Sequence, residues 1–323
     1  MKKWIFVLSS LLAAQLVLAM ILGLTGEDYS TFQTEGKLLS FNKQEVSGLQ
    51  IVDSTDSMKI EKREGKWLLP NSGHFPASQH KVEQLLDTLA ALEKGWPVAR
   101  TRGAAQRFAV DKEQFERKLV LVSDDESQTT LYVGSSPGFR KVYVRPGDKD
   151  EIFAVDFNIW EANAKIEDWI DTDILALDRS SVQRIEMPGI IMQRQDGTLQ
   201  VMNLDENEQT NVDESSVLLG MLTGLRIQSL LGTEMKPEYR QDEPALEIRI
   251  TTEGGEVFDY RFSKPQDASY YVLKRSDLDF YFEVAEYTIN PVREATREKL
   301  VQARTEEAPS DLAYDKDGDA SPR

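Results

Sequence analysis

The chain has 323 residues, with 38 Lys or Arg against 55 Asp or Glu, so its net charge at neutral pH is −17. This acidic balance argues against nucleic acid as a partner, because phosphate binding depends on Lys and Arg. The absence of cysteine excludes disulfides, thiolate metal sites and thiol nucleophiles, and two histidines leave little for imidazole catalysis. The length and the 40% apolar content predict about two domains, each with its own core.

An uncharged, mostly apolar run from Trp4 to Leu24 follows Lys2 and Lys3. As a helix it would extend about 30 Å, the thickness of the hydrocarbon core of a bilayer. We expect residues 1–26 to form an N-terminal membrane anchor. The lysines would hold the N-terminus in the cytoplasm, so the rest of the chain would lie in the periplasm, at the bacterial inner membrane. The alternative is a signal peptide cleaved after Ala19, although its apolar region would be unusually long.

Between this anchor and the C-terminal tail, the same order of elements occurs twice. Three short strands are expected around residues 49–52, 58–62 and 67–69, and again around 182–186, 190–194 and 199–202. The dipeptides Glu64-Gly65 and Asp196-Gly197 predict the corresponding hairpin turns. Ile51 then aligns with Ile185, an offset of 134 residues.

One amphipathic helix follows in each copy. Ser78 is the expected N-cap and Gly95 the expected stop of the first helix, while Asn211 and Glu214 predict a capping box for the second. Helical spacing predicts two buried stripes: Val82, Leu85, Leu86, Leu89 and Leu92 in the first helix, and Val217, Met221, Leu222 and Leu225 in the second.

Each copy ends with further strands and a helical segment, at residues 156–169 and 285–304. Leu119 aligns with Ile248 at an offset of 129. The fold class is therefore expected to be α+β, with two tandem repeats of an antiparallel sheet with packed helices, over residues 37–173 and 174–304. The acidic tail, residues 305–323, is expected to be disordered because it cannot bury enough apolar surface.

Several segments resemble one bacterial family: residues 63–70, Ala77 with the 82–92 helix, 107–111, 131–134 and 142–145. The family is domain of unknown function 4340, and the resemblance extends over nearly all of the chain between anchor and tail. In that family the segment at Phe108 usually runs Phe-Gly-Leu-Asp, so Ala109-Val110 departs from the pattern. The resemblance implies an N-terminally anchored protein often encoded beside gliding-motility-type ABC transporter components, and it carries no catalytic signature.

Motifs that could support catalysis have simpler interpretations. Residues 134–138 read G-x-S-x-G, but Pro137 lacks the N–H that an oxyanion hole requires, which favours a hairpin turn. His74 and His80 flank Pro76, so they cannot share a helix face, and no Asp or Glu lies between them, so no metal site is predicted. Two of the three carboxylates of Asp168, Asp171 and Asp173 could form the acid–base pair of a glycoside hydrolase, but short Asp-rich links are common as caps and turns.

Two further groups of residues have a binding interpretation and a structural one. A local basic surface is expected in the first domain. It could bind acidic lipid or a partner, or its side chains could be exposed on strands and a loop without a binding role. Aromatic residues near one hairpin of the second domain are expected to be half-buried rather than a ligand platform. The basic residues are Arg100, Arg102, Arg107, Arg140, Lys141 and Arg145, and the aromatic ones are Tyr271, Tyr281 and Phe282.

These patterns predict no catalytic, cofactor-binding or metal-binding residue. The expected function is that of a non-enzymatic, membrane-anchored periplasmic accessory or scaffold protein of an ABC-type transport or envelope system, with an integral membrane or envelope protein as partner. The alternatives are a carboxylate-dependent hydrolase of an envelope glycan and a solute-binding module that uses a cleft between the domains.

Overall fold

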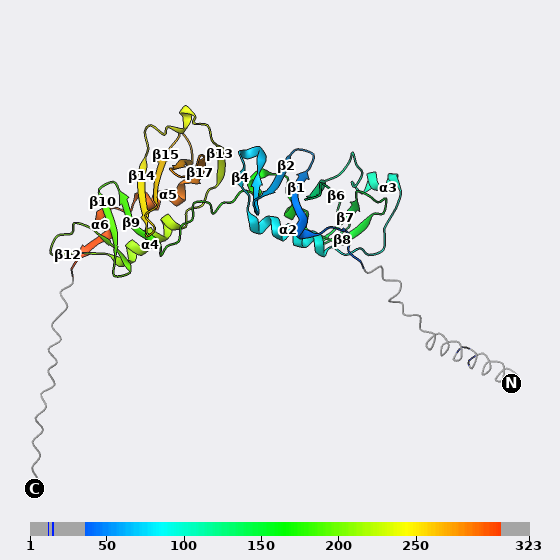
Figure 1. The fold of residues 1–323 in the computed structure, drawn as a ribbon, viewed down its shortest axis with the longest axis horizontal. Coiled ribbons are helices and arrows are strands. Elements are labelled where there is room, and N and C mark those ends of the chain that lie inside the picture. Colours follow the sequence, from blue (N-terminus) through cyan, green and yellow to red (C-terminus); the bar gives the residue numbers. More distant parts are fainter. Residues whose placement is uncertain (1–11, 13–14, 16–35, 305–323) are drawn as a thin grey trace, which may run out of the picture. The chain divides into compact units, whose positions relative to one another are not determined.

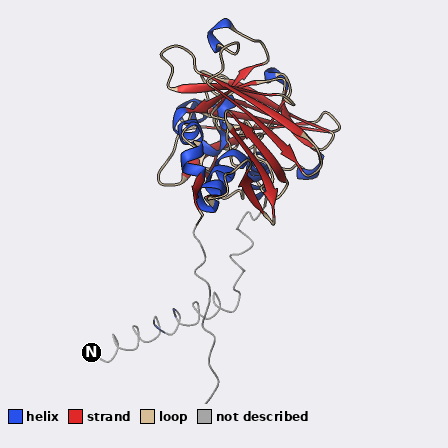
Figure 2. Ribbon diagram, turned by 90° about the vertical axis from the view of Figure 1, so that its left-hand side faces the viewer, coloured by secondary structure: helices blue, strands red, loops and turns tan. Residues whose placement is uncertain are grey.

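A computed structural model describes Leu12, Gln15 and residues 36–304 (Figure 1). The predicted anchor, apart from Leu12 and Gln15, and the predicted acidic tail lie outside the described residues. Within the described part of the chain, no helix has both the length and the apolar character needed to cross a membrane. The chain divides into two compact units between Asp171 and Thr172. In both units strands make up most of the regular structure (Figure 2).

The first unit is built on an eight-stranded antiparallel sheet in the order β4-β3-β2-β1-β5-β6-β7-β8. Its strands are β1 Val46–Val52, β2 Ser57–Arg63, β3 Lys66–Leu69, β4 Phe75–Pro76, β5 Arg117–Ser123, β6 Gln128–Val133, β7 Lys141–Pro146 and β8 Phe153–Asp156. Its helices are α2 Gln79–Ala91 and α3 Arg102–Arg107, with 3-10 turns η2 Lys43–Glu45, η3 Pro70–Ser72, η4 Ile159–Ala162 and η5 Ile166–Asp168.

The second unit contains another eight-stranded antiparallel sheet, in the order β11-β10-β9-β14-β15-β16-β17-β13, and a two-stranded sheet, β12-β18. Its strands are β9 Val182–Met187, β10 Ile190–Gln195, β11 Thr198–Val201, β12 Glu208–Thr210, β13 Ser229–Gly232, β14 Leu246–Thr252, β15 Val257–Ser263, β16 Tyr270–Arg275, β17 Tyr281–Ala285 and β18 Val301–Ala303. Its helices are α4 Val212–Thr223, α5 Glu286–Arg293 and α6 Arg297–Leu300, with the 3-10 turn η6 Pro237–Tyr239. The expected α+β class with two large antiparallel sheets is confirmed.

The two predicted hairpin turns have the same geometry. Glu64 and Gly65 have φ angles of 50° and 80°, and Asp196 and Gly197 have 47° and 82°. Two central residues with positive φ match the twist of antiparallel strands, which is why Gly follows an acidic residue at both turns. The flanking residues pair directly across each hairpin, β2 with β3 and β10 with β11.

Seven strands of each large sheet correspond in order, β3-β2-β1-β5-β6-β7-β8 with β11-β10-β9-β14-β15-β16-β17. The eighth strands do not correspond, because β4 lies beside β3 whereas β13 lies beside β17, at the opposite edge. Ile51 pairs with Met58, and Ile185 pairs with Met192, so both partners are 134 residues apart. In the later strands the offset is 129, as in the pairs Leu131 with Pro146 and Tyr260 with Arg275. Where the two strand groups meet, the sheets differ: Ile51 pairs with Leu119, whereas Ile185 pairs with Ile250, two residues beyond the predicted Ile248.

Helix α2 buries the predicted stripe and contacts β3. Val82, Leu85, Leu86 and Leu89 are at most 1% exposed, and buried Leu92 is the C-cap, so the helix ends before Gly95. Ser78 is the N-cap, although its side chain makes no capping hydrogen bond.

The predicted buried stripe of α4 is wrong at two positions. Val217 is 50% exposed and Met221 is half-buried, whereas Leu222 and Leu225 are buried as expected. The inward face instead includes two hydroxyl residues that hydropathy treats as polar. Ser215 and Thr223 donate hydrogen bonds to the carbonyls of Leu199, at 2.7 Å, and Leu219, at 2.8 Å, so their burial leaves no unsatisfied hydroxyl. Half of the predicted capping box is present, since the Asn211 side chain accepts from the Glu214 N–H at 3.3 Å. The other half is absent, because the Asn211 N–H donates to the Leu300 carbonyl at 2.8 Å instead of to the Glu214 side chain.

Both predicted terminal helices are shorter than expected. Residues 156–169 form only η4 and η5, because the side chains of Asn158 and Asn163 accept backbone N–H groups two residues ahead and favour turns over a helix. Residues 285–304 break into α5, α6 and β18.

Candidate functional site

Two adjoining hollows on the first unit share Gln84, Trp160 and Glu161, and we call them together the Trp160 groove. The smaller hollow, of about 330 Å³, is also lined by Lys81 and Asp168. The larger, of about 950 Å³, is also lined by Ser136, Arg140 and Lys141. The structure thus brings the serine of the G-x-S-x-G motif, two of the predicted basic residues and one predicted carboxylate to the walls of one groove.

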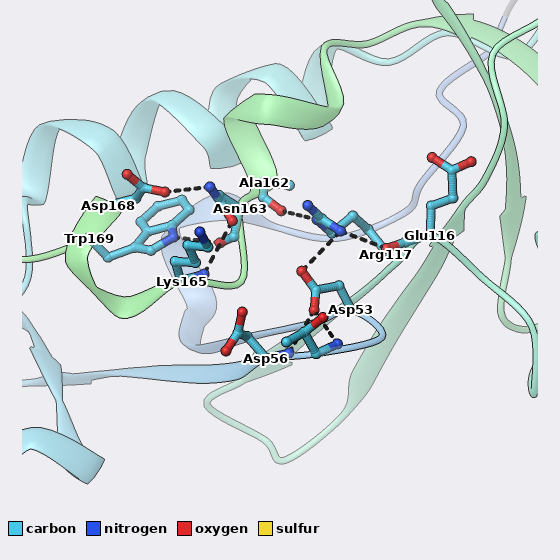
Figure 3. Close-up of polar contacts among 10 residues, drawn as sticks. Asp53, Asp56, Glu116, Arg117, Ala162, Asn163, Lys165, Asp168 and Trp169 are labelled. Atoms are coloured by element: carbon cyan, nitrogen blue, oxygen red, sulfur yellow. Dashed lines mark hydrogen bonds and ion pairs between the residues drawn. The ribbon is translucent and has the colours of Figure 1, made fainter.

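The segment that carries Trp160, residues 158–169 with η4 and η5, is held against α2 by two hydrogen bonds. The Thr88 hydroxyl donates to the Glu161 carboxylate at 3.3 Å, and the Lys81 ammonium donates to the Asp168 carbonyl at 2.8 Å. The indole N–H of buried Trp169 donates to the Asn163 carbonyl at 2.7 Å (Figure 3). The Trp160 side chain, by contrast, is 74% exposed.

Arg117 connects this segment to the sheet, and an ion pair with Asp53 holds Arg117 in place. Arg117, at the start of β5, donates from Nε to the Ala162 carbonyl at 3.2 Å and lies 3.1 Å from the Asp53 carboxylate (Figure 3). Asp53 also accepts the N–H groups of Thr55 and Asp56, at 2.8 and 2.7 Å. Burial alone would raise the pKa of Asp53, but these hydrogen bonds and the charges of Arg117 and Lys165 lower it below its ordinary value. Asp53 therefore stays ionised and supports the segment that carries Trp160.

The basic end of the groove is a turn. Residues 134–138 lie in the connection from β6 to β7, where the Ser136 hydroxyl contacts the carbonyls of Gly138, at 2.7 Å, and Lys141, at 2.6 Å. This is the hairpin connection that the sequence favours over a nucleophile elbow. Phe139 is 88% exposed, and the Arg140 guanidinium lies 5.0 Å from the centre of its ring.

The predicted basic surface is not continuous, and Arg145 does not belong to it. The Arg145 side chain is buried, because residues of α3 and the following loop cover this side of β6 and β7. Arg100 and Arg102 line a separate hollow beside α3, and Arg107 stacks on Phe108 with a guanidinium-to-ring distance of 4.6 Å.

The remaining predicted residues do not converge on a reactive site. Asp173 forms an ion pair with Arg226 at 2.7 Å, and both histidines are exposed. In the part of the chain that the structure describes, no group of three or more His, Asp or Glu side chains could hold a metal ion. The aromatic residues of the second unit are more deeply buried than expected, with Tyr271 and Phe282 at 0% exposure and Tyr281 at 9%.

Sequence analysis missed Trp160 and Phe139 as candidate binding residues. Each is a large aromatic side chain followed directly by a charged residue, Glu161 or Arg140, which is a weak signal of exposure. The helix expected over residues 156–169 hid it, since one face of such a helix would have buried Trp160.

Comparison with known proteins places the chain by sequence. The family model described as Domain of unknown function (DUF4340) matches residues 67–244, from β3 to just before β14. No curated protein and no solved structure matches the chain. Because the family match spans more than half of the 323 residues, the chain belongs to the DUF4340 family.

Proposed function

We propose that this protein is a non-enzymatic, membrane-anchored periplasmic accessory or scaffold protein of an ABC-type transport or envelope system. In this proposal the Trp160 groove receives a segment of an integral membrane or envelope protein. The observation that carries the proposal is the exposed side chain of Trp160 on the wall of a groove that Arg140 and Lys141 also line. The exposed ring of Phe139 lies next to Arg140, outside the lining of the groove.

The energetics of protein interfaces support this assignment. Trp and Arg are the side chains most often found to carry interface binding energy, especially where a pocket excludes water around them. The hydrogen bonds from Lys81 and Thr88 already order the segment that carries Trp160, so little conformational entropy remains to be lost on binding. Arg140 and Lys141 would favour an acidic partner surface and speed the encounter.

The proposed anchor contributes through proximity. Eleven residues separate Leu24 from Gly36, so the first unit would stay within about 40 Å of the bilayer. Confinement at this distance raises the effective concentration of a membrane partner, and a modest interface then suffices. We also infer that the two units are tandem copies of one ancestral unit, because seven strands of each large sheet match in order and the first hairpins match in register.

The test is site-specific crosslinking in native membranes. A photoreactive residue at Gln84, on the wall of the groove, should capture one integral membrane or envelope protein. Trp160→Ala should reduce that yield about tenfold or more, as expected for loss of a hot-spot aromatic. Trp96→Ala is the matched control, because Trp96 is also exposed, at 65%, and does not line the groove. Equal yields from both variants would contradict the proposal.

A second set of variants separates this function from the hydrolase alternative. Asp171→Asn combined with Asp173→Asn should leave transport or envelope function intact, because a scaffold needs no general acid and neither residue lines the groove. Loss of function in the double Asn variant, with folding and crosslinking unchanged, would instead support the hydrolase.

A further inference from the structure

The described residues contain two buried arginines, and only one of them has a carboxylate partner. Arg275, 4% exposed, donates to Asp277 at 2.6 and 3.0 Å. Arg145, 5% exposed, has no carboxylate within 4.0 Å among the described residues. It donates only to the backbone carbonyls of Val110 at 2.8 Å, Lys149 at 3.0 Å and Pro146 at 3.4 Å, and its guanidinium lies 4.6 Å from the centre of the Tyr132 ring.

An unpaired buried cation is energetically unfavourable. Removing a guanidinium from water is costly, and neutral carbonyls and a ring face offset that cost only in part. Nε and one terminal nitrogen of Arg145 donate to the carbonyls, whereas the other terminal nitrogen donates no hydrogen bond to any described residue. This nitrogen is not among the fully buried side-chain atoms without a partner, so it remains accessible to a small ligand. An anion placed near this nitrogen would supply the missing countercharge.

Arg145 lines a hollow that can admit such an anion. The hollow has a volume of about 340 Å³ and lies beside α3, outside the Trp160 groove. Three further cations line it, Arg100, Arg102 and Lys112, against the carboxylates of Asp111, Glu113 and Asp150. The lining residues therefore have a formal charge of +1 in a chain of −17. Arg100 contributes least to the attraction of an anion, because it already lies 3.8 Å from the carboxylate of Glu151, outside the lining. Asp111 faces its own turn, where its carboxylate accepts the Glu113 N–H at 3.2 Å.

We propose that this hollow binds an oxyanion group, a phosphate or a carboxylate, with Arg145 at its floor and Arg102 at its rim. Arg102 is exposed on the first turn of α3, so it can approach a bound anion from the solvent side. This site goes beyond the proposed function, and its test requires no partner protein, so either proposal can fail without the other.

Equilibrium dialysis of the full-length chain in neutral detergent at low salt tests the site with two probes, radiolabelled inorganic phosphate and radiolabelled acetate. We expect one saturable site per chain for at least one probe, with affinity that falls as salt is added. The preferred probe identifies whether the physiological group is a phosphate or a carboxylate.

Two variants at opposite ends of α3 provide the matched comparison. Arg102→Gln should weaken binding about tenfold, whereas Arg107→Gln should bind as the unchanged chain does, because Arg107 does not line the hollow. Arg145→Gln should abolish binding, and if this variant does not fold, the Arg102 and Arg107 variants still decide. The proposal is overturned if neither probe saturates, if a folded Arg145→Gln chain still binds, or if Arg102→Gln and Arg107→Gln bind equally well.

Discussion

Replacing Gly134 by alanine should destabilise the first unit severely, although the change adds a single methyl group. A Cβ at this position would lie 2.0 Å from the Phe108 carbonyl oxygen and 2.4 Å from that of Ala109. The obstacle is backbone rather than a movable side chain. Ala109 already has a φ of 54°, a conformation unfavourable for a residue with a side chain, so this segment has little freedom to retreat.

The magnitude follows from what must move. Relief of the overlap costs about 1–3 kcal/mol, as for other overpacked sites. It also disturbs two hydrogen bonds that the Phe108 carbonyl accepts from Ser135, from N at 2.9 Å and from Oγ at 3.2 Å, worth about 0.5–1.5 kcal/mol each. The free energy of unfolding should fall by about 2–6 kcal/mol, out of the 5–15 kcal/mol typical of a domain. Near the middle of this range, Tm of the first unit should fall by roughly 10–20 °C.

Differential scanning calorimetry of the full chain provides the measurement. Gly138→Ala is the control from the same motif, since a Cβ there would meet nothing within 4 Å, and its Tm should change little. Similar Tm values for the two variants would refute the reasoning from close backbone approach.

Two other predictions concern the N-terminus and acid stability. Alkali-washed membranes should retain the chain, and its intact mass should include residues 1–24; a soluble form that begins at Met20 would contradict the anchor. The pKa of Asp53 is lower in the folded chain, so its carboxylate stabilises the first unit at neutral pH, and this contribution is lost as the pH falls from 3.8 through the lowered value. Urea unfolding at a series of pH values provides the test. Asp53→Asn should lower the free energy of unfolding at pH 7 by about 1–2 kcal/mol, and below pH 3.8 the free energy of unfolding of this variant should fall less steeply than that of the unchanged chain. The same pH dependence in both chains would exclude this role of Asp53.

Local sequence signals predicted the hairpins well because each signal has one structural solution. An acidic residue before glycine, between alternating apolar residues, suits a two-residue turn with positive φ, and both such turns occur as expected. The α2 stripe was equally predictable, since only one helix face is apolar. Helix α4 is apolar on more than one side, so hydropathy alone does not predict which side is buried. The buried side includes Ser215 and Thr223, whose hydroxyls donate hydrogen bonds to backbone carbonyls in the folded chain.

The candidate binding residues were less predictable because their exposure depends on distant segments. Arg145 alternates with buried Val144 along β7, which is typical of an exposed face, yet α3 and the loop after it cover that face. Trp160 is the opposite case, because its size favours burial but its side chain is exposed. Asn158 begins the short turn η4 and Asn163 ends it, so no longer helix forms that could bury Trp160 on one face. The residues adjacent in sequence therefore predict neither the burial of Arg145 nor the exposure of Trp160.

The different registers where the strand groups of the two sheets meet have a consequence for how such a fold can diverge. Ile51 and Ile185 have partners in β5 and β14 that differ by two positions from the alignment of the later strands. Side chains alternate between faces with a period of two, so a slide of two residues returns every apolar side chain to the core, whereas a slide of one would expose them all. Length changes in the connection before β5 or β14 can thus accumulate during evolution, provided that the strand re-enters the sheet in even steps.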